Sequence, residues 1–287
     1  MEIIETIAMM QEASERWRKD DGIIALVPTM GFLHDGHLEL LRVGREKGDK
    51  LIMSLFVNPT QFGPQEDYEK YPRDTEGDLE KARSKGVDTV FMPSAREMYP
   101  DGFQTTVAVE QVTQYLCGKS RPGHFAGVTT VVAKLFNITK PHLAIFGEKD
   151  YQQLVVIRQM VRDLNMGIDI IGVPTVREQD GLAMSSRNSY LTPEERESAL
   201  SLKKGLELAG AMVAKGEKDS AKITGTVREL ILNHPFTEID YVTICNRENL
   251  IDIETIDEPA LLALAVNVGR ARLIDNAILR KHQEGLQ

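Results

Sequence analysis

The sequence is poor in the features that mark secreted, membrane-spanning and fibrous proteins. Its 287 residues include only two cysteines, Cys117 and Cys245, which are far apart and have no metal-ligand spacing. This pattern argues against a disulfide framework or a zinc site. No apolar run approaches the length that spans a bilayer. The first residues carry acids and lack the basic region and cleavage site of a signal peptide. We therefore expect a cytoplasmic protein.

An excess of positive charge is also missing. The chain has 43 acidic against 34 basic residues and a net charge of −9. Non-specific binding to nucleic acid depends on a basic surface, so this balance argues against it, while a small anionic ligand needs only a few local cations. The composition, 42% hydrophobic and 27% charged, is typical of a globular protein. The length corresponds to one large domain or two ordinary ones.

Short apolar runs alternate with amphipathic stretches over the first 174 residues. The runs that predict strands are Ile23–Val27, Leu51–Val57, Thr89–Met92, Leu143–Phe146 and Ile168–Val173. The stretches that predict helices are Leu38–Lys47, Thr75–Lys85, Val128–Thr139 and Gln152–Leu164. Buried strands separated by helices indicate a Rossmann-like, doubly wound α/β fold, whose ligands bind at the carboxyl ends of the strands.

The pattern changes after about residue 174. Thr192, Pro193 and the acids Glu194 and Glu195 predict a helix start. A further helix is expected at Ile223–Leu232, and strands at Tyr241–Ile244, Leu261–Val268 and Arg272–Ile274. We predict two domains, an α/β domain at 1–174 and a smaller α+β domain at 175–287.

The segment Pro28–His37, PTMGFLHDGH, joins a predicted strand to a predicted helix. A helix N-terminus presents main-chain N–H groups and partial positive charge to a phosphate. His34 and His37 are three residues apart, so both can face one side of the first turn and donate to a phosphate oxygen or a leaving group. Alternatively, one histidine caps the helix and the other is an ordinary surface residue.

Two further segments carry groups suited to phosphate. Gly181–Asn188, GLAMSSRN, lies in a polar connection between the expected domains, where two hydroxyls and a guanidinium can hold phosphate oxygens. Phe146–Gln153, FGEKDYQQ, again follows a strand, and Lys149 could neutralise charge on an α-phosphate. Asp150 could cap the helix or contact Mg²⁺ or ribose. Alone, the first segment would be an ordinary turn and the second a charged helix start.

Two other segments could bind the rest of a substrate. Phe56–Phe62, FVNPTQF, places polar amides after a strand, although Asn-Pro is also a common turn. Ser120–Val128, SRPGHFAGV, precedes a helix with small and β-branched residues, which could pack against a ligand or against the sheet.

These five segments, in this order, resemble the pantothenate synthetases of the HxGH nucleotidylyltransferase superfamily along nearly the whole chain. The C-terminal part resembles them less distinctively, through Ala271–Asn276, ARLIDN. The resemblance implies a two-step ligation in pantothenate and coenzyme A biosynthesis. Pantoate attacks ATP to give pantoyl adenylate and pyrophosphate, and β-alanine then gives pantothenate and AMP. It also implies Mg²⁺ with ATP and a homodimer. The charge balance and the lack of long apolar runs predict no nucleic-acid or membrane partner.

The resemblance assigns residues by motif position. His37 would assist pyrophosphate departure, His34 would contact the phosphates, Lys149 would hold the α-phosphate, and Gln61 and Gln153 would bind pantoate, with Gln61 also near β-alanine. The metal would have no site made by the protein alone, with Asp150 a candidate contact. The expected ATP site is Met30, Gly31, Phe32, Leu33, His34, Asp35, Gly36, His37, Gly147, Glu148, Lys149, Asp150, Val176, Met184, Ser185, Ser186 and Arg187.

Two other functions are compatible with part of the pattern. A nucleotidylyltransferase of the same superfamily would stop after nucleotidyl transfer, whereas a ligase releases AMP only with both substrates. More distant relatives carry a lysine-rich second motif where this chain has Met184–Arg187, which favours the ligase. A non-catalytic nucleotide-binding regulator would be expected to lack His37 or Lys149, and both are present.

Overall fold

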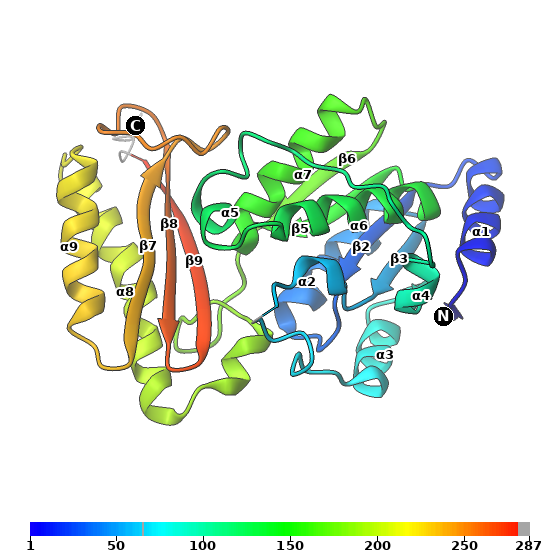
Figure 1. Cartoon of the computed structure of the whole chain (residues 1–287), viewed down its shortest axis with the longest axis horizontal. Coiled ribbons are helices and arrows are strands. Elements are labelled where there is room, and N and C mark those ends of the chain that lie inside the picture. Colours follow the sequence, from blue (N-terminus) through cyan, green and yellow to red (C-terminus); the bar gives the residue numbers. More distant parts are fainter. Residues whose placement is uncertain (65, 281–287) are drawn as a thin grey trace, which may run out of the picture. The chain divides into compact units, whose positions relative to one another are not determined.

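The computed structural model describes residues 1–64 and 66–280, which form two compact units (Figure 1). The first unit contains the described residues of 1–113, 121–148 and 153–176. The second contains residues 114–120, 149–152 and the described chain from residue 177 onward. The expected domains, 1–174 and 175–287, differ from these units mainly in the two short segments, and residues 281–287 of the second lie outside the described residues.

The first unit is built on a six-stranded parallel sheet with the order β1-β4-β3-β2-β5-β6. Its strands are β1 (Glu2–Ile4), β2 (Ile24–Thr29), β3 (Lys50–Leu55), β4 (Thr89–Phe91), β5 (Leu143–Gly147) and β6 (Asp169–Val173). The chain runs from β2 through β3 to β4 on one side, whereas β5 and β6 lie on the other side of β2. Ligands of open α/β sheets bind at such a switch point, beyond the carboxyl ends of the strands. The expected α/β fold is confirmed.

Helices flank this sheet and bury its apolar strands. They are α1 (Ile7–Lys19), α2 (Asp35–Lys47), α3 (Thr75–Ser84), α4 (Ala95–Met98), α6 (His124–Thr139) and α7 (Tyr151–Asp163), with the short 3-10 turn η1 (Pro59–Gln61). Leu40 and Leu41 of α2 pack with Ala25 and Val27 of β2 in one core. The sequence predicted the central elements to within a few residues at each end, but it did not predict β1 or α1.

The second unit contains a three-stranded antiparallel sheet, β7-β8-β9. Its elements are α5 (Leu116–Ser120), η2 (Glu148–Asp150), η3 (Ser186–Tyr190), α8 (Pro193–Ala214), α9 (Ser220–Leu232), β7 (Thr237–Cys245), β8 (Ala260–Val268) and β9 (Ala271–Leu279). Thr192 caps α8, as the sequence predicted, and the Glu195 side chain in turn accepts the Thr192 N–H. Leu202 and Leu206 of α8 pack with the sheet in a separate core.

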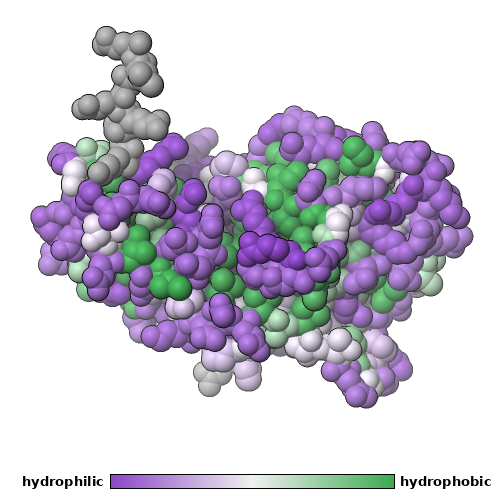
Figure 2. Space-filling view, turned by 90° about the horizontal axis from the view of Figure 1, so that it is seen from above, coloured by the Kyte–Doolittle hydropathy of each residue, from purple (hydrophilic) through white to green (hydrophobic). Residues whose placement is uncertain are grey.

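Hydrophilic residues cover most of the face shown in Figure 2, and hydrophobic residues gather there in smaller patches. Within residues 1–64 and 66–280, no helix has the length and apolar character needed to cross a membrane. Cys117 and Cys245 are both buried and both free.

Candidate functional site

The turn that carries the two predicted histidines joins the carboxyl end of β2 to the start of α2. Gly31 and Phe32 adopt left-handed conformations, with φ of 84° and 51°. A side chain at Gly31 would also approach the side chains of Asp78 and Leu55 to 2.9 Å, so both the positive φ and the space favour glycine there. His34 is the N-cap of α2, and its ring centroid lies 4.1 Å from that of His37. The turn therefore brings both imidazoles together at a helix N-terminus.

A hydrogen bond from the main chain determines the protonation of the His37 ring. The N–H of His34 lies 3.3 Å from Nδ1 of His37, and a main-chain N–H can only donate. In the neutral ring Nδ1 is then the acceptor, so the proton sits on Nε2. His37 therefore presents Nε2–H as a hydrogen-bond donor, which suits an oxygen on which negative charge develops.

The side chain of Asp78 in α3 fixes this turn through hydrogen bonds to its main chain. The sequence did not predict this residue. Its carboxylate oxygens accept the N–H groups of Phe32 and Leu33, both at 2.7 Å. Lys81, one turn along α3, donates to the Leu33 carbonyl at 2.8 Å. These two N–H groups are therefore already used as donors to Asp78 and do not face a ligand. A phosphate would meet the N-terminal N–H groups of α2, from Asp35 onward.

Asp78 is only 1% exposed, although its side chain is a carboxyl group. Burial raises the pKa of the Asp78 carboxyl above its usual value, against the opposing effects of the two N–H groups and Lys81. The sequence alone did not indicate this role, because Asp78 lies in a charged stretch and its burial is known only from the fold. A carboxylate on an apolar face needs partners.

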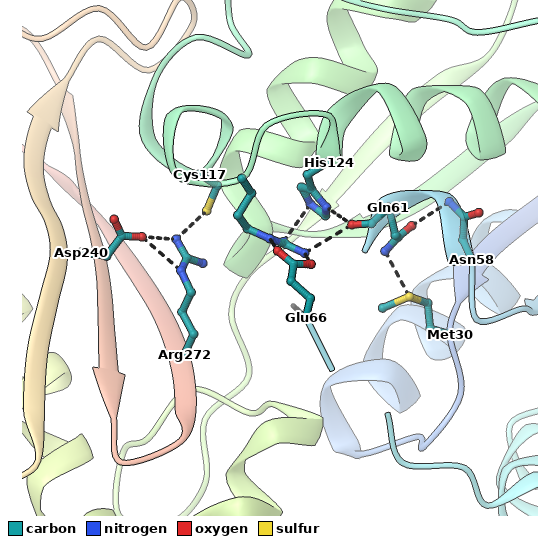
Figure 3. A network of polar contacts seen from close by, with 9 residues as sticks. Met30, Asn58, Gln61, Glu66, Cys117, His124, Asp240 and Arg272 are labelled. Atoms are coloured by element: carbon teal, nitrogen blue, oxygen red, sulfur yellow. Dashed lines mark hydrogen bonds and ion pairs between the residues drawn. The ribbon is translucent and has the colours of Figure 1, made fainter. Parts of the chain in front are cut away.

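Gln61 follows β3 and is held in a single orientation by Asn58 (Figure 3). The orientation of Asn58 is itself fixed, because its Oδ1 accepts the main-chain N–H of Thr60 while its Nδ2 donates to the Gly127 carbonyl at 3.1 Å. Nδ2 also donates to Gln61 Oε1 at 3.1 Å. Gln61 Nε2 consequently faces the other way, 3.1 Å from Sδ of Met30. The amide of Gln61 therefore offers a donor to a substrate oxygen.

A charged layer supports the main chain of Gln61. Arg121 forms a two-point pair with Glu66, at 2.6 and 2.7 Å. Arg121 also donates to Nε2 of His124, whose Nδ1 lies 2.8 Å from the Gln61 carbonyl (Figure 3). Burial alone would raise the pKa of the Glu66 carboxyl, but the Arg121 guanidinium outweighs it and the pKa is lowered. The predicted segment Ser120–Val128 thus supports Gln61 through Arg121 and His124.

Lys149 and the Gly181–Asn188 segment belong to the second unit. Lys149 is half-buried in η2, and the following Asp150 is exposed. A small pocket within this unit is lined by Lys149, Ser185, Asn188 and Asp275 together with apolar side chains. The structure therefore brings the predicted Lys149 and Ser185 to one place.

Three other predicted residues lie on or beside the elements already named. Ser185 caps η3 by accepting the N–H of Arg187. Gln153 is half-buried in the first turn of α7, and Val176 is half-buried after β6; both are in the first unit. The described residues contain no group of three or more His, Cys, Asp or Glu side chains placed to hold a metal ion.

A doubly wound sheet whose central strand ends in a paired-histidine turn defines an α/β enzyme of the HxGH type. The family model for pantoate-β-alanine ligase matches residues 2–278. The pantothenate synthetase of Desulfatibacillum aliphaticivorans is 57% identical over 279 residues, which cover 97% of this chain and 99% of that protein.

Two solved structures are similar over nearly the whole chain. The crystal structure of pantothenate synthetase from Thermus thermophilus has a TM-score of 0.91 and 44% identity, covering 96% of this chain and 99% of its own. Pantoate-β-alanine ligase from Francisella tularensis, complexed with β-γ ATP and β-alanine, has a TM-score of 0.80 and 34% identity, with 97% of each chain covered. The chain belongs to the pantoate-β-alanine ligase family, and its reaction is the ligation of pantoate and β-alanine.

Proposed function

We propose that the ligation proceeds through pantoyl adenylate formed from ATP. A carboxylate oxygen of pantoate attacks the α-phosphorus, and the bond to pyrophosphate breaks. The amine of β-alanine then attacks the acyl carbon, loses a proton, and displaces AMP. The relative from Francisella tularensis is complexed with β-γ ATP and β-alanine, which supports both substrates. The observation that carries the proposal is the paired-histidine turn, with His37 fixed as an Nε2–H donor.

In the first unit, His37 donates from Nε2 as negative charge develops on the departing pyrophosphate, and His34 contacts the phosphates beside it. The N-terminus of α2 adds partial positive charge for the same oxygens. Gln61 donates through Nε2 to an oxygen of pantoate and lies close to β-alanine, as its orientation by Asn58 supports. Gln153 binds pantoate, and Val176 contacts the adenine side.

In the second unit, the ammonium of Lys149 holds the α-phosphate as its charge builds during attack. Met184–Arg187 contact the triphosphate, and the small pocket lined by Lys149 and Ser185 supports a shared role for these two residues. The ATP-binding set is otherwise the one expected from the motifs, with Gly147 and Glu148 leading into Lys149.

Mg²⁺ fits this donor set as an ion bound mainly to the triphosphate. Mg²⁺ takes one or two carboxylates and completes its shell with water and substrate phosphates, so one exposed carboxylate such as that of Asp150 is sufficient. The ion would neutralise triphosphate charge. A homodimer stays a prediction from the family resemblance, and a cytoplasmic location stays a prediction from the sequence.

The two-step route is tested by incubating the protein with ATP and pantoate, with and without β-alanine. Pyrophosphate release and ATP–pyrophosphate exchange should need pantoate alone, whereas sustained AMP release should need both substrates. Sustained AMP release without β-alanine would contradict the ligation, and exchange without pantoate would favour a nucleotidylyltransferase.

The role of His37 is tested in the first half-reaction. His37→Ala should lower the single-turnover rate of adenylate formation roughly 10²–10³-fold, because loss of one preorganised donor at the developing charge has about this effect. Its use of preformed pantoyl adenylate with β-alanine should be unchanged. Near-normal adenylate formation would refute the assignment.

A further inference from the structure

The Ala271–Asn276 motif has no role in the reaction described so far, yet β9 carries it beside two segments of the proposed ATP site. Successive residues of a strand point to opposite faces of the sheet. Asp275 is buried with Leu273 and Ala271, whereas Asn276 and Arg272 lie on the other face. Each of the neighbouring residues Asp275 and Asn276 contacts a different segment.

On one face, Asn276 fixes the main chain at Lys149. Its Nδ2 donates to the Lys149 carbonyl at 2.9 Å. The segment 149–152 is held at a second point, because Gln152 Nε2 donates to the Tyr115 carbonyl at 2.7 Å.

The segment around Tyr115 is itself attached to the sheet. Arg272 pairs with Asp240 at 2.7 Å and lies 3.4 Å from Sγ of Cys117 (Figure 3). Ser120 also donates to Asp240 at 2.7 Å. The two short segments that join the second unit are therefore attached to one sheet face by side chains of β7 and β9.

On the other face, Asp275 fixes the start of the Gly181–Asn188 segment. Its carboxylate is 3% exposed and accepts two hydrogen bonds from Arg177, at 2.7 and 2.9 Å. Arg177 also donates to the Gly181 carbonyl at 3.1 Å. A two-point pair of this kind fixes the guanidinium plane as well as its position.

From these contacts we propose that Asp275 and Asn276 are positioning residues for adenylation. Asn276 holds the main chain of Lys149 and so fixes the position of its ammonium group. Asp275 acts through Arg177 and fixes the position of the segment that carries Ser185. Neither residue need touch a substrate. The inference rests on the proposed role of Lys149 in the first half-reaction.

The test is a double-mutant cycle with Asn276→Ala, Lys149→Ala and the double variant, measured in pantoate-dependent ATP–pyrophosphate exchange. Asn276→Ala should lower kcat of exchange about tenfold, since a displaced catalytic group loses at least the contribution of one hydrogen bond. It should leave the reaction of preformed pantoyl adenylate with β-alanine unchanged. In the Lys149→Ala background the same substitution should have little further effect.

The outcomes distinguish the proposed role of Lys149 from the positioning role of Asn276. An unimpaired Lys149→Ala would refute the role of Lys149. An impaired Lys149→Ala with a normal Asn276→Ala, or equal effects of Asn276→Ala in both backgrounds, would refute the positioning role alone. Asn267→Ala, a half-buried asparagine of the same sheet, is the matched control and should keep the wild-type exchange rate.

The Asp275 arm is tested with Arg177→Lys, which keeps the charge but loses the two-point pair. It should raise KM for ATP about tenfold in the exchange assay, with the folded fraction checked by circular dichroism. A folded variant with unchanged KM and kcat would refute the Asp275 part of the proposal.

Discussion

The variant Asp78→Asn should lower the rate of adenylation much more than it lowers the unfolding free energy of the protein. The substitution keeps the shape of the side chain and one acceptor oxygen, but it places an NH2 group against one of the two N–H donors, those of Phe32 and Leu33. An N–H group that loses its buried partner costs about 1–3 kcal/mol. The turn would then rotate or open to relieve this contact, moving the histidines that follow it.

The stability change should nevertheless be small. Burial raises the pKa of Asp78, which means that ionising this carboxyl in the folded protein is unfavourable, and a neutral amide removes that penalty. The two effects partly offset each other, so we expect a loss of about 1 kcal/mol or less in unfolding free energy. Adenylation should fall more, by about 10- to 100-fold, because displacement of a catalytic group by about 1 Å has effects of this size.

The assays are urea unfolding and the single-turnover rate of adenylate formation. Asp74→Asn is the matched control, because Asp74 is the exposed N-cap of the same helix and asparagine caps about as well. A wild-type rate in Asp78→Asn would show that the carboxylate does not hold the turn. A stability loss large enough to account for the lower rate would show that its role is structural only.

Two further predictions concern stability. Glu66→Gln should lower the unfolding free energy by about 1 kcal/mol at pH 7, a value reduced for the partial exposure of the Arg121 pair. Because the folded-state pKa of Glu66 is lowered, its stabilisation is present above the unfolded value of about 4.3 and is lost as the pH falls through the folded-state value. Urea unfolding at pH 7 and at about pH 3 should therefore show a difference from wild type that shrinks in acid; a constant difference would exclude the ion pair as its source. Thr192→Ala removes the acceptor that the Glu195 N–H uses at 3.3 Å and should cost about 1 kcal/mol, seen by the same method, with no change in ligation rate. Equal stability of this variant would mean that the cap contributes nothing measurable.

The sequence by itself determined the elements whose pattern is local. Apolar runs such as Ile23–Val27 and Leu143–Phe146 predicted central strands, because a strand covered on both faces must be apolar throughout. Thr192 and Pro193 predicted the start of α8 from capping chemistry alone. The placement of His34 and His37 at a strand-to-helix turn was equally local. The sequence did not predict the short strand β1 or the helix α1, since three residues give little pattern and α1 buries only Met10, Ala13 and Ser14.

Only the tertiary structure decided how the site residues are held. The side chain of Asp78 acts on a turn 45 residues away in sequence, and that of Asn276 acts on Lys149 over 127 residues. Neither pairing has a local pattern, because the contacts arise when separate strands and helices pack. The same holds for the donor orientation of Gln61 and for the attachment of residues 149–152 to the second unit. The sequence named the groups that react, whereas packing determined their orientation and, for His37, the nitrogen that carries the proton.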